Sequence, residues 1–122
     1  MRIKSSNTEL TSGFDPNKIF HLTTEAGYDW ADKKAAADLY EETKKTLIAK
    51  LANQANEKSE AAKERYAFST AEYEDFVTKM NEARKEANKA KVKYDAAVTW
   101  SDNMRTLEAN KRQEMKLSKG AP

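Results

Sequence analysis

Side chains that commonly carry out catalysis are scarce in this sequence of 122 residues. It contains one histidine, His21, and no cysteine, so a metal centre or a thiol nucleophile lacks its usual partners. Carboxylates cluster at 41–42 and 72–75, but helix surfaces and helix N-termini favour acidic residues in any case. The three glycines are not grouped, which excludes a glycine-rich phosphate loop. We therefore expect no enzymatic activity, no catalytic or metal-ligating residues and no cofactor.

The strongest local charge lies in residues 84–94, where five basic side chains accompany one acid. The five are Arg84, Lys85, Lys89, Lys91 and Lys93. On a helix, their three-, four- and seven-residue spacings produce two basic stripes. Such stripes can contact the phosphates of single- or double-stranded nucleic acid without reading its sequence. The alternative is that these lysines only favour helix and solubility, because the whole chain is balanced at a net charge of +2.

Composition favours an elongated helical protein over a globular one. Charged residues make up 34% of the chain and hydrophobic residues 39%, many of them alanine. No apolar run approaches the ~20 residues that cross a bilayer, and the first residues lack the apolar core of a signal peptide. We expect a cytoplasmic protein that does not act at a membrane.

Two long helical patterns must position any functional side chains. Apolar and small residues recur at three- and four-residue steps from Ser69 to about Leu117, after a possible capping box formed by Ser69 and Glu72. A second pattern runs from Asp29 to about Tyr66. The predicted organisation is an irregular arm over 1–28, a two-helix hairpin over 29–117 with helices at about 30–66 and 70–116, and a disordered tail over 118–122.

The short link at 67–69 predicts that the two helices pack antiparallel, like a coiled coil, with an alanine-rich seam between them. If Tyr66 lies opposite Thr70, large side chains meet small ones along this seam. The register sets Leu47, Ile48 and Leu51 against Ala83, Ala87 and Ala90, and Tyr73, Phe76 and Met80 against Ala62, Ala61 and Ala55. The fold class is therefore expected to be all-α.

In this register the second helix extends beyond the first over 107–117. Apolar side chains beside the seam form a candidate protein interface: Val77, Val98, Trp100 and Leu107. We expect them to support a homodimer with a four-helix arrangement over part of its length, because an alanine-rich hairpin buries little apolar area. A competing possibility is that the arm covers this surface within one chain, through Phe14, Ile19, Phe20 and Leu22.

Residues 81–96 (NEARKEANKAKVKYDA) and 107–115 (LEANKRQEM) resemble small helical phage proteins of about this length. Genes for such proteins often lie beside single-strand annealing or recombination genes. The resemblance covers roughly 31–115 and leaves the arm unmatched. It implies a non-enzymatic accessory protein in the host-cell cytoplasm that assists phage DNA recombination or replication through protein or nucleic-acid contacts. The alternative is an inhibitor that binds a host protein, such as a defence nuclease or a polymerase.

Overall fold

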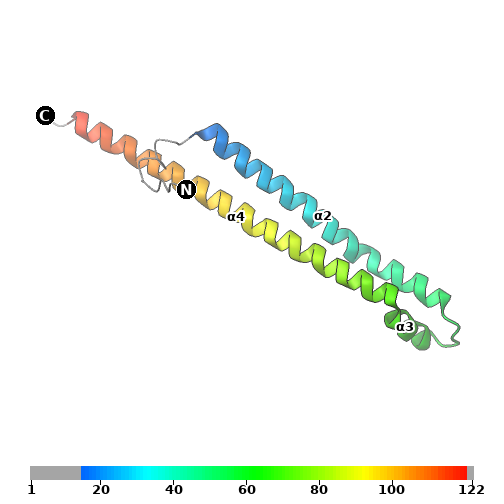
Figure 1. Cartoon of the computed structure of the whole chain (residues 1–122). Helices are drawn as coiled ribbons and strands as arrows, with labels where there is room; N and C mark the ends of the chain where they lie inside the picture. The colour runs from blue at the N-terminus through cyan, green and yellow to red at the C-terminus, as the bar shows by residue number, and fades with distance from the viewer. Residues whose placement is uncertain (1–14, 121–122) are drawn as a thin grey trace, which may run out of the picture. The chain divides into compact units, whose positions relative to one another are not determined.

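The computed structural model describes residues 15–120, with the backbone alone for 119 and 120. Three helices follow one another: α2 (Pro16–Gln54), α3 (Glu60–Ser69) and α4 (Ala71–Gly120) (Figure 1). No strand occurs within 15–120, which confirms the all-α prediction. Among these residues, no helix joins sufficient length to sufficient hydropathy for a bilayer crossing.

The chain divides into two compact units. Of the described residues, unit 1 contains 15–27 and 92–120, and unit 2 contains 28–91. In unit 2, the α2 segment runs beside the α4 segment in the opposite direction, and α3 lies at the end where the chain turns back (Figure 1). The buried apolar side chains of unit 2 are Ala37, Leu51, Ala67, Ala87 and Ala90. An antiparallel helix pair with an alanine-rich seam is therefore present in this unit, whereas the four-helix dimer stays a prediction.

Helix α2 begins earlier than expected, so most of the predicted arm is helical. The Asp15 carboxylate accepts a hydrogen bond from the Asn17 backbone N–H at 2.9 Å, and the Asp15 carbonyl oxygen accepts one from the Ile19 N–H at 3.1 Å. Proline suits the first helical position because its φ is already helical and its missing N–H would be unpaired there. Asp15 and Pro16 therefore start a helix, and the interpretation of 16–28 as an irregular arm is wrong.

The first predicted helix is in fact two helices. Helix α2 ends at Gln54, and the Ser59 side chain caps α3 by accepting a hydrogen bond from the Ala62 N–H at 3.1 Å. Residues 53–59 contain two asparagines and a serine, whose side chains compete with the helix for backbone hydrogen bonds. The expected continuation of one helix to about residue 66 is therefore wrong.

Thr70 lies between α3 and α4 and forms hydrogen bonds with both helices. Its backbone is extended, with φ −75° and ψ 147°, and its N–H bonds the Ala67 carbonyl oxygen at the end of α3. Its Oγ1 accepts a hydrogen bond from the Tyr73 N–H at 3.1 Å, while the Ser69 hydroxyl donates to the Tyr66 carbonyl oxygen at 2.7 Å. The cap of α4 is therefore Thr70, and the expected capping box beginning at Ser69 is wrong.

The register of the helix pair also differs from the expected one. Phe76, expected opposite Ala61, instead packs its ring edge against Tyr40, with ring centroids 5.4 Å apart. Lys50 of α2 lies 3.8 Å from Glu72 in the first turn of α4. Because the connection runs from residue 55 to residue 70 rather than over 67–69, α2 is shifted by several turns along α4.

In unit 1, the beginning of α2 packs against the second half of α4. A Cβ atom added to Gly27 would lie 3.2 Å from Cε1 of Tyr94, so the two helices approach closely at this glycine. The buried side chains among the described residues of this unit are Ile19, Ser101 and Met104. The approach of Gly27 to Tyr94 also departs from the expected register, in which Tyr66 lies opposite Thr70.

The four side chains proposed to cover this region within one chain have different environments. Ile19 is buried, Phe20 and Leu22 are exposed, and Phe14 lies outside the described residues. At the other end of the chain, α4 continues to Gly120, so 118–120 are helical rather than disordered, and 121–122 lie outside the described residues.

Candidate protein-binding surfaces

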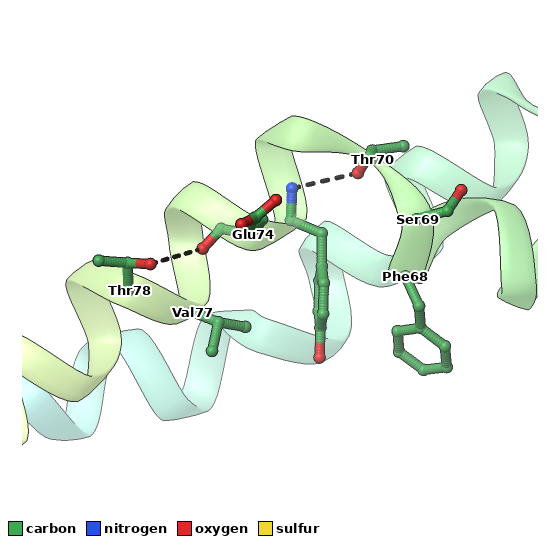
Figure 2. Close-up of a pocket in the computed structure, with 7 residues that line it drawn as sticks. Phe68, Ser69, Thr70, Glu74, Val77 and Thr78 are labelled. Atoms are coloured by element: carbon green, nitrogen blue, oxygen red, sulfur yellow. Dashed lines mark hydrogen bonds between the residues drawn. The ribbon is translucent and has the colours of Figure 1, made fainter.

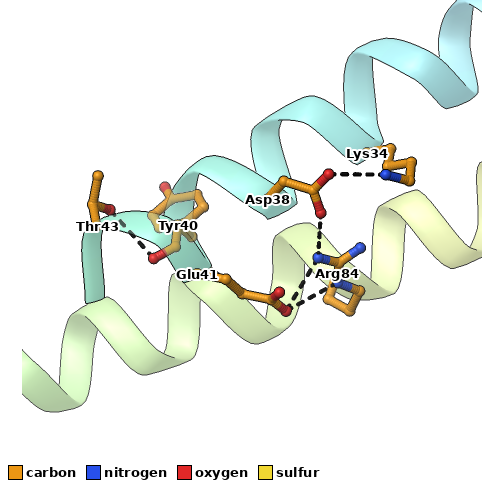
Figure 3. Close-up of polar contacts among 6 residues, drawn as sticks. All are labelled: Lys34, Asp38, Tyr40, Glu41, Thr43 and Arg84. Atoms are coloured by element: carbon orange, nitrogen blue, oxygen red, sulfur yellow. Dashed lines mark hydrogen bonds and ion pairs between the residues drawn. The ribbon is translucent and has the colours of Figure 1, made fainter. Parts of the chain in front are cut away.

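The basic segment of α4 does not form one free cationic surface, because Arg84 is held by α2. Its Nη2 donates to Asp38 Oδ1 at 2.8 Å and lies 3.1 Å from Glu41 Oε1, which also accepts from Nε at 3.3 Å (Figure 3). Lys34 reaches the second oxygen of Asp38 at 2.9 Å. The Arg84 side chain retains only 31% of its exposure. Arg84 therefore joins α4 to α2 instead of offering its charge to a ligand.

The charges in this cluster reinforce one another. Hydrogen bonds from Arg84 and then Lys34 lower the pKa of the Asp38 carboxyl below its ordinary value. The hydrogen bond to Asp38 raises the pKa of the Arg84 guanidinium in turn. Both groups are thus ionised at neutral pH, and the positive charge of Arg84 is balanced inside the helix pair.

The other four basic residues of the predicted site are exposed on α4. Lys89 lies 3.8 Å from Glu86 of the same helix. Within the described part of the chain, Lys85, Lys91 and Lys93 make no ion pair. Lys93 belongs to unit 1 and the rest to unit 2, so the five residues are divided between the two units.

A groove opens where α3 meets α4. Its volume is about 320 Å³, and Figure 2 shows its lining. The lining residues are Phe68, Ser69, Thr70, Tyr73, Glu74, Val77 and Thr78. Phe68 comes from the last turn of α3 and remains 44% exposed. Its ring meets Tyr73 edge to face, with centroids 5.2 Å apart. We call these residues the corner groove.

The local sequence explains why the corner groove is open. The extended backbone of Thr70 redirects the chain, so that the end of α3 and the start of α4 present their aromatic rings to each other. The Thr78 hydroxyl donates to the Glu74 carbonyl oxygen at 3.0 Å and is thereby satisfied within α4. The groove thus combines an aromatic and aliphatic wall with a single carboxylate, on Glu74. This chemistry is suited to binding and holds no nucleophile–base pair.

The predicted interface residues are divided between the two units. Val77 is partly buried and lines the corner groove in unit 2. Val98 is partly buried in unit 1, where Trp100 and Leu107 are exposed at 40% and 45%.

Sequence reasoning missed Phe68, because 67–69 was interpreted as a link, and Tyr73, because it was assigned to the seam. The aromatic spacing of Tyr66, Phe68 and Tyr73 around a threonine cap was the available signal.

No metal-binding cluster is found among the described residues. They contain no group of three or more histidine, aspartate or glutamate side chains placed to hold a metal ion. His21 is exposed on α2, next to the edge of the Phe20 ring.

Comparison with protein-family models, with curated proteins and with solved structures finds no match to this chain.

Proposed function

We propose that this chain is a non-catalytic accessory protein of phage type, which assists DNA recombination or replication by binding another protein at the corner groove. The observation that carries this proposal is the exposed Phe68 ring set against Tyr73 at the junction of two helices. Aromatic side chains in preformed pockets dominate the free energy of many protein interfaces. The phage context rests on the resemblance of residues 81–96 and 107–115.

The corner groove is held in shape before any partner arrives. The Thr70 hydroxyl accepts from the Tyr73 N–H and also donates to the Ala67 carbonyl oxygen at 2.9 Å, which fixes the angle between the helices. Ala67 is fully buried behind it. A partner therefore loses little free energy to ordering this surface, and burial of apolar area contributes about 25 cal/mol per Å².

The charges around the corner groove indicate the kind of partner. The first turns of α4 carry three acidic residues, Glu72, Glu74 and Asp75. Lys50 of α2 lies 3.8 Å from Glu72, and Lys79 lies 3.0 Å from Asp75. Among the described residues, Glu74 has no ion pair. A protein segment that inserts an aromatic or aliphatic side chain beside a lysine or arginine fits this surface.

A protein partner is favoured over direct binding of DNA. The guanidinium of Arg84 is already committed to two carboxylates, and Lys89 lies near Glu86. Fewer free cations mean fewer phosphate contacts and a weaker affinity. The homodimer expected from the sequence, whose candidate interface residues lie in both units, remains a separate proposal.

Capture from phage-infected host cells tests the function. A photo-crosslinking amino acid at Thr78 labels whatever occupies the groove in the tagged chain. We expect a phage recombination or replication protein in the crosslinked product, strongly reduced by Phe68→Ser. The matched control is Phe20→Ser, since Phe20 is an exposed phenylalanine of unit 1.

Two outcomes would contradict the proposal in different ways. A host nuclease or polymerase crosslinked in the same Phe68-dependent manner would establish the inhibitor alternative and overturn the recombination role. Equal capture by Phe68→Ser and Phe20→Ser would show that the corner groove is not the binding surface.

A further inference from the structure

One face of α4 in unit 1 is exposed and carries no charge. It comprises Val92, Ala96, Trp100, Asn103, Leu107 and Asn110, which recur at three- and four-residue steps and therefore fall within one side of the helix. All six side chains are exposed, with Val92 at 68% and Leu107 at 45%. We call this set the uncharged face. In a chain that is 34% charged, such a run of exposed uncharged positions is typical of an interface.

The uncharged face borders the side of α4 that unit 1 buries. Ser101 and Met104 are the buried residues of this helix segment, and they lie on the other side of the helix from Val92 and Asn110 at ~100° per residue. Trp100 and Leu107 lie within one turn of Met104 and stay 40% and 45% exposed, whereas Val92 is 68% exposed.

We propose that the uncharged face binds the same face of a second copy of this chain, with the two α4 helices antiparallel. The face offers no cation to an acidic partner or to phosphate, and no anion to a basic partner. Its polar members are two asparagines, each with two N–H donors and an acceptor, and Asn103 lies at the centre of the face, where it can pair with Asn103 of an identical face. A buried asparagine at such a position fixes the register of paired helices.

Charge complementarity selects the antiparallel orientation. Glu114 continues the line of the uncharged face toward the C-terminus, and Lys93 lies beside its other end. A parallel pair would set Glu114 against Glu114 of the second copy, which is repulsive. An antiparallel pair centred between Trp100 and Leu107 brings Glu114 toward Lys93 of the second copy. It also packs each Trp100 on the other Leu107, as a two-fold interface requires.

The oligomeric state of the full chain tests this proposal by sedimentation velocity over micromolar concentrations. We expect a dimer for the wild type and for Leu39→Asp, because Leu39 is an exposed leucine of unit 2. Leu107→Asp is expected to weaken dimerisation by at least ~10-fold while the helical circular dichroism stays unchanged. A wild type that is monomeric throughout would overturn the proposal, as would equal dimerisation by the two variants.

The identity of the occupant and its orientation are tested separately. If the wild type is monomeric and deletion of residues 1–14 produces a dimer, the N-terminal segment covers the face and the proposal fails. The chain has no native cysteine, so single cysteines report the orientation. An antiparallel pair predicts a disulfide-linked dimer for Asn103→Cys and none for Leu117→Cys, whereas ready crosslinking of Leu117→Cys would overturn it. Because Phe68 lies in unit 2, none of these outcomes depends on the corner groove.

Discussion

At the scale of single residues, Arg84 is the side chain whose role the structure defines most clearly. It joins α4 to α2 through Asp38 and Glu41, and Lys34 completes the cluster (Figure 3). The guanidinium presents its N–H groups in a fixed fork, so its contacts with these two carboxylates are directional. Arg84 therefore specifies how α2 and α4 align in unit 2, a task that a flexible lysine performs less well.

The Asp38 carboxylate makes the stability of the chain depend on pH. Its folded pKa lies below its unfolded value, so its stabilising effect is complete above about pH 4 and is lost as pH falls through the folded pKa. We expect Asp38→Asn to lower the Tm by a few degrees at pH 7 and to leave it unchanged near pH 2. Thermal melts followed by circular dichroism measure this. A Tm difference that persists near pH 2 would assign the effect to packing.

Thr70 can be distinguished from its neighbour by substitution. Thr70→Ala removes the hydroxyl that caps α4 and is expected to cost ~0.5–2 kcal/mol of unfolding free energy. Ser69→Ala is the control, because its hydroxyl only donates back to the Tyr66 carbonyl oxygen. Urea denaturation measures both values. A larger loss for Ser69→Ala would restore the capping box expected from the sequence.

At the scale of the elements, the helix pair is built from small side chains and a few large ones. Leu51 is 2% exposed, and the other buried apolar residues of unit 2 are alanines. Alanines allow α2 and α4 to approach closely, but each contributes little transfer free energy. Stability in this unit therefore depends strongly on the few positions where a large side chain is buried.

Leu51→Ala tests this dependence. Truncation of a buried leucine costs ~2–5 kcal/mol, since both the transfer free energy and the packing are lost. Leu39→Ala is the matched control, and as a surface substitution it is expected to change stability by less than ~0.5 kcal/mol. Equal denaturation midpoints for the two variants would mean that α2 does not pack as the structure shows.

Gly27 tests the close approach in unit 1. Alanine is ~1 kcal/mol more favourable than glycine within a helix, but the new methyl group would lie 3.2 Å from the Tyr94 ring. We expect Gly27→Ala to yield less than this gain in the wild type and the whole gain in a Tyr94→Ala background. Denaturation curves of the two single variants and the double variant measure the coupling. Equal gains in both backgrounds would contradict the close approach.

At the scale of the whole molecule, the positive and negative charges nearly cancel, and the surface includes regions suited to protein contacts. The net charge is +2, and part of the basic segment is neutralised within unit 2. Exposed apolar side chains occur at the corner groove and along the uncharged face. These features favour short-range recognition by shape over long-range attraction to a polyanion.

DNA binding is therefore expected to be weak. Neither single- nor double-stranded DNA should change mobility in a gel-shift assay at ~0.15 M salt, because Arg84 is paired and, among the described residues, only Lys85, Lys91 and Lys93 of the basic segment are without an ion pair. Arg84→Gln should leave any retardation at low salt unchanged, while substitution of Lys91 should reduce it. A salt-resistant complex with either form of DNA would contradict the protein-binding proposal.

The fold class was predictable from the sequence because alanine, lysine and glutamate dominate both helical patterns. The boundaries were not, since Asp15 and Pro16 fit a turn as well as a helix start, and one alanine-rich stretch conceals the break before Ser59. The expected register was wrong because it was derived from a link over 67–69, whereas residues 55–70 connect α2 to α4. The corner groove depends on that same connection, so its aromatic pair could not be located before α3 was known.

The turn of the chain at α3 also bears on the order in which contacts of the helix pair form. Lys50 and Glu72 meet across the corner, whereas Arg84 reaches partners 43 and 46 positions away in the sequence. The entropy lost on closing a loop grows with its length, so contacts near the corner form at the lowest cost. We therefore expect pairing of α2 with α4 in unit 2 to proceed from Thr70 outward, because each alanine layer shortens the loop that the next layer must close.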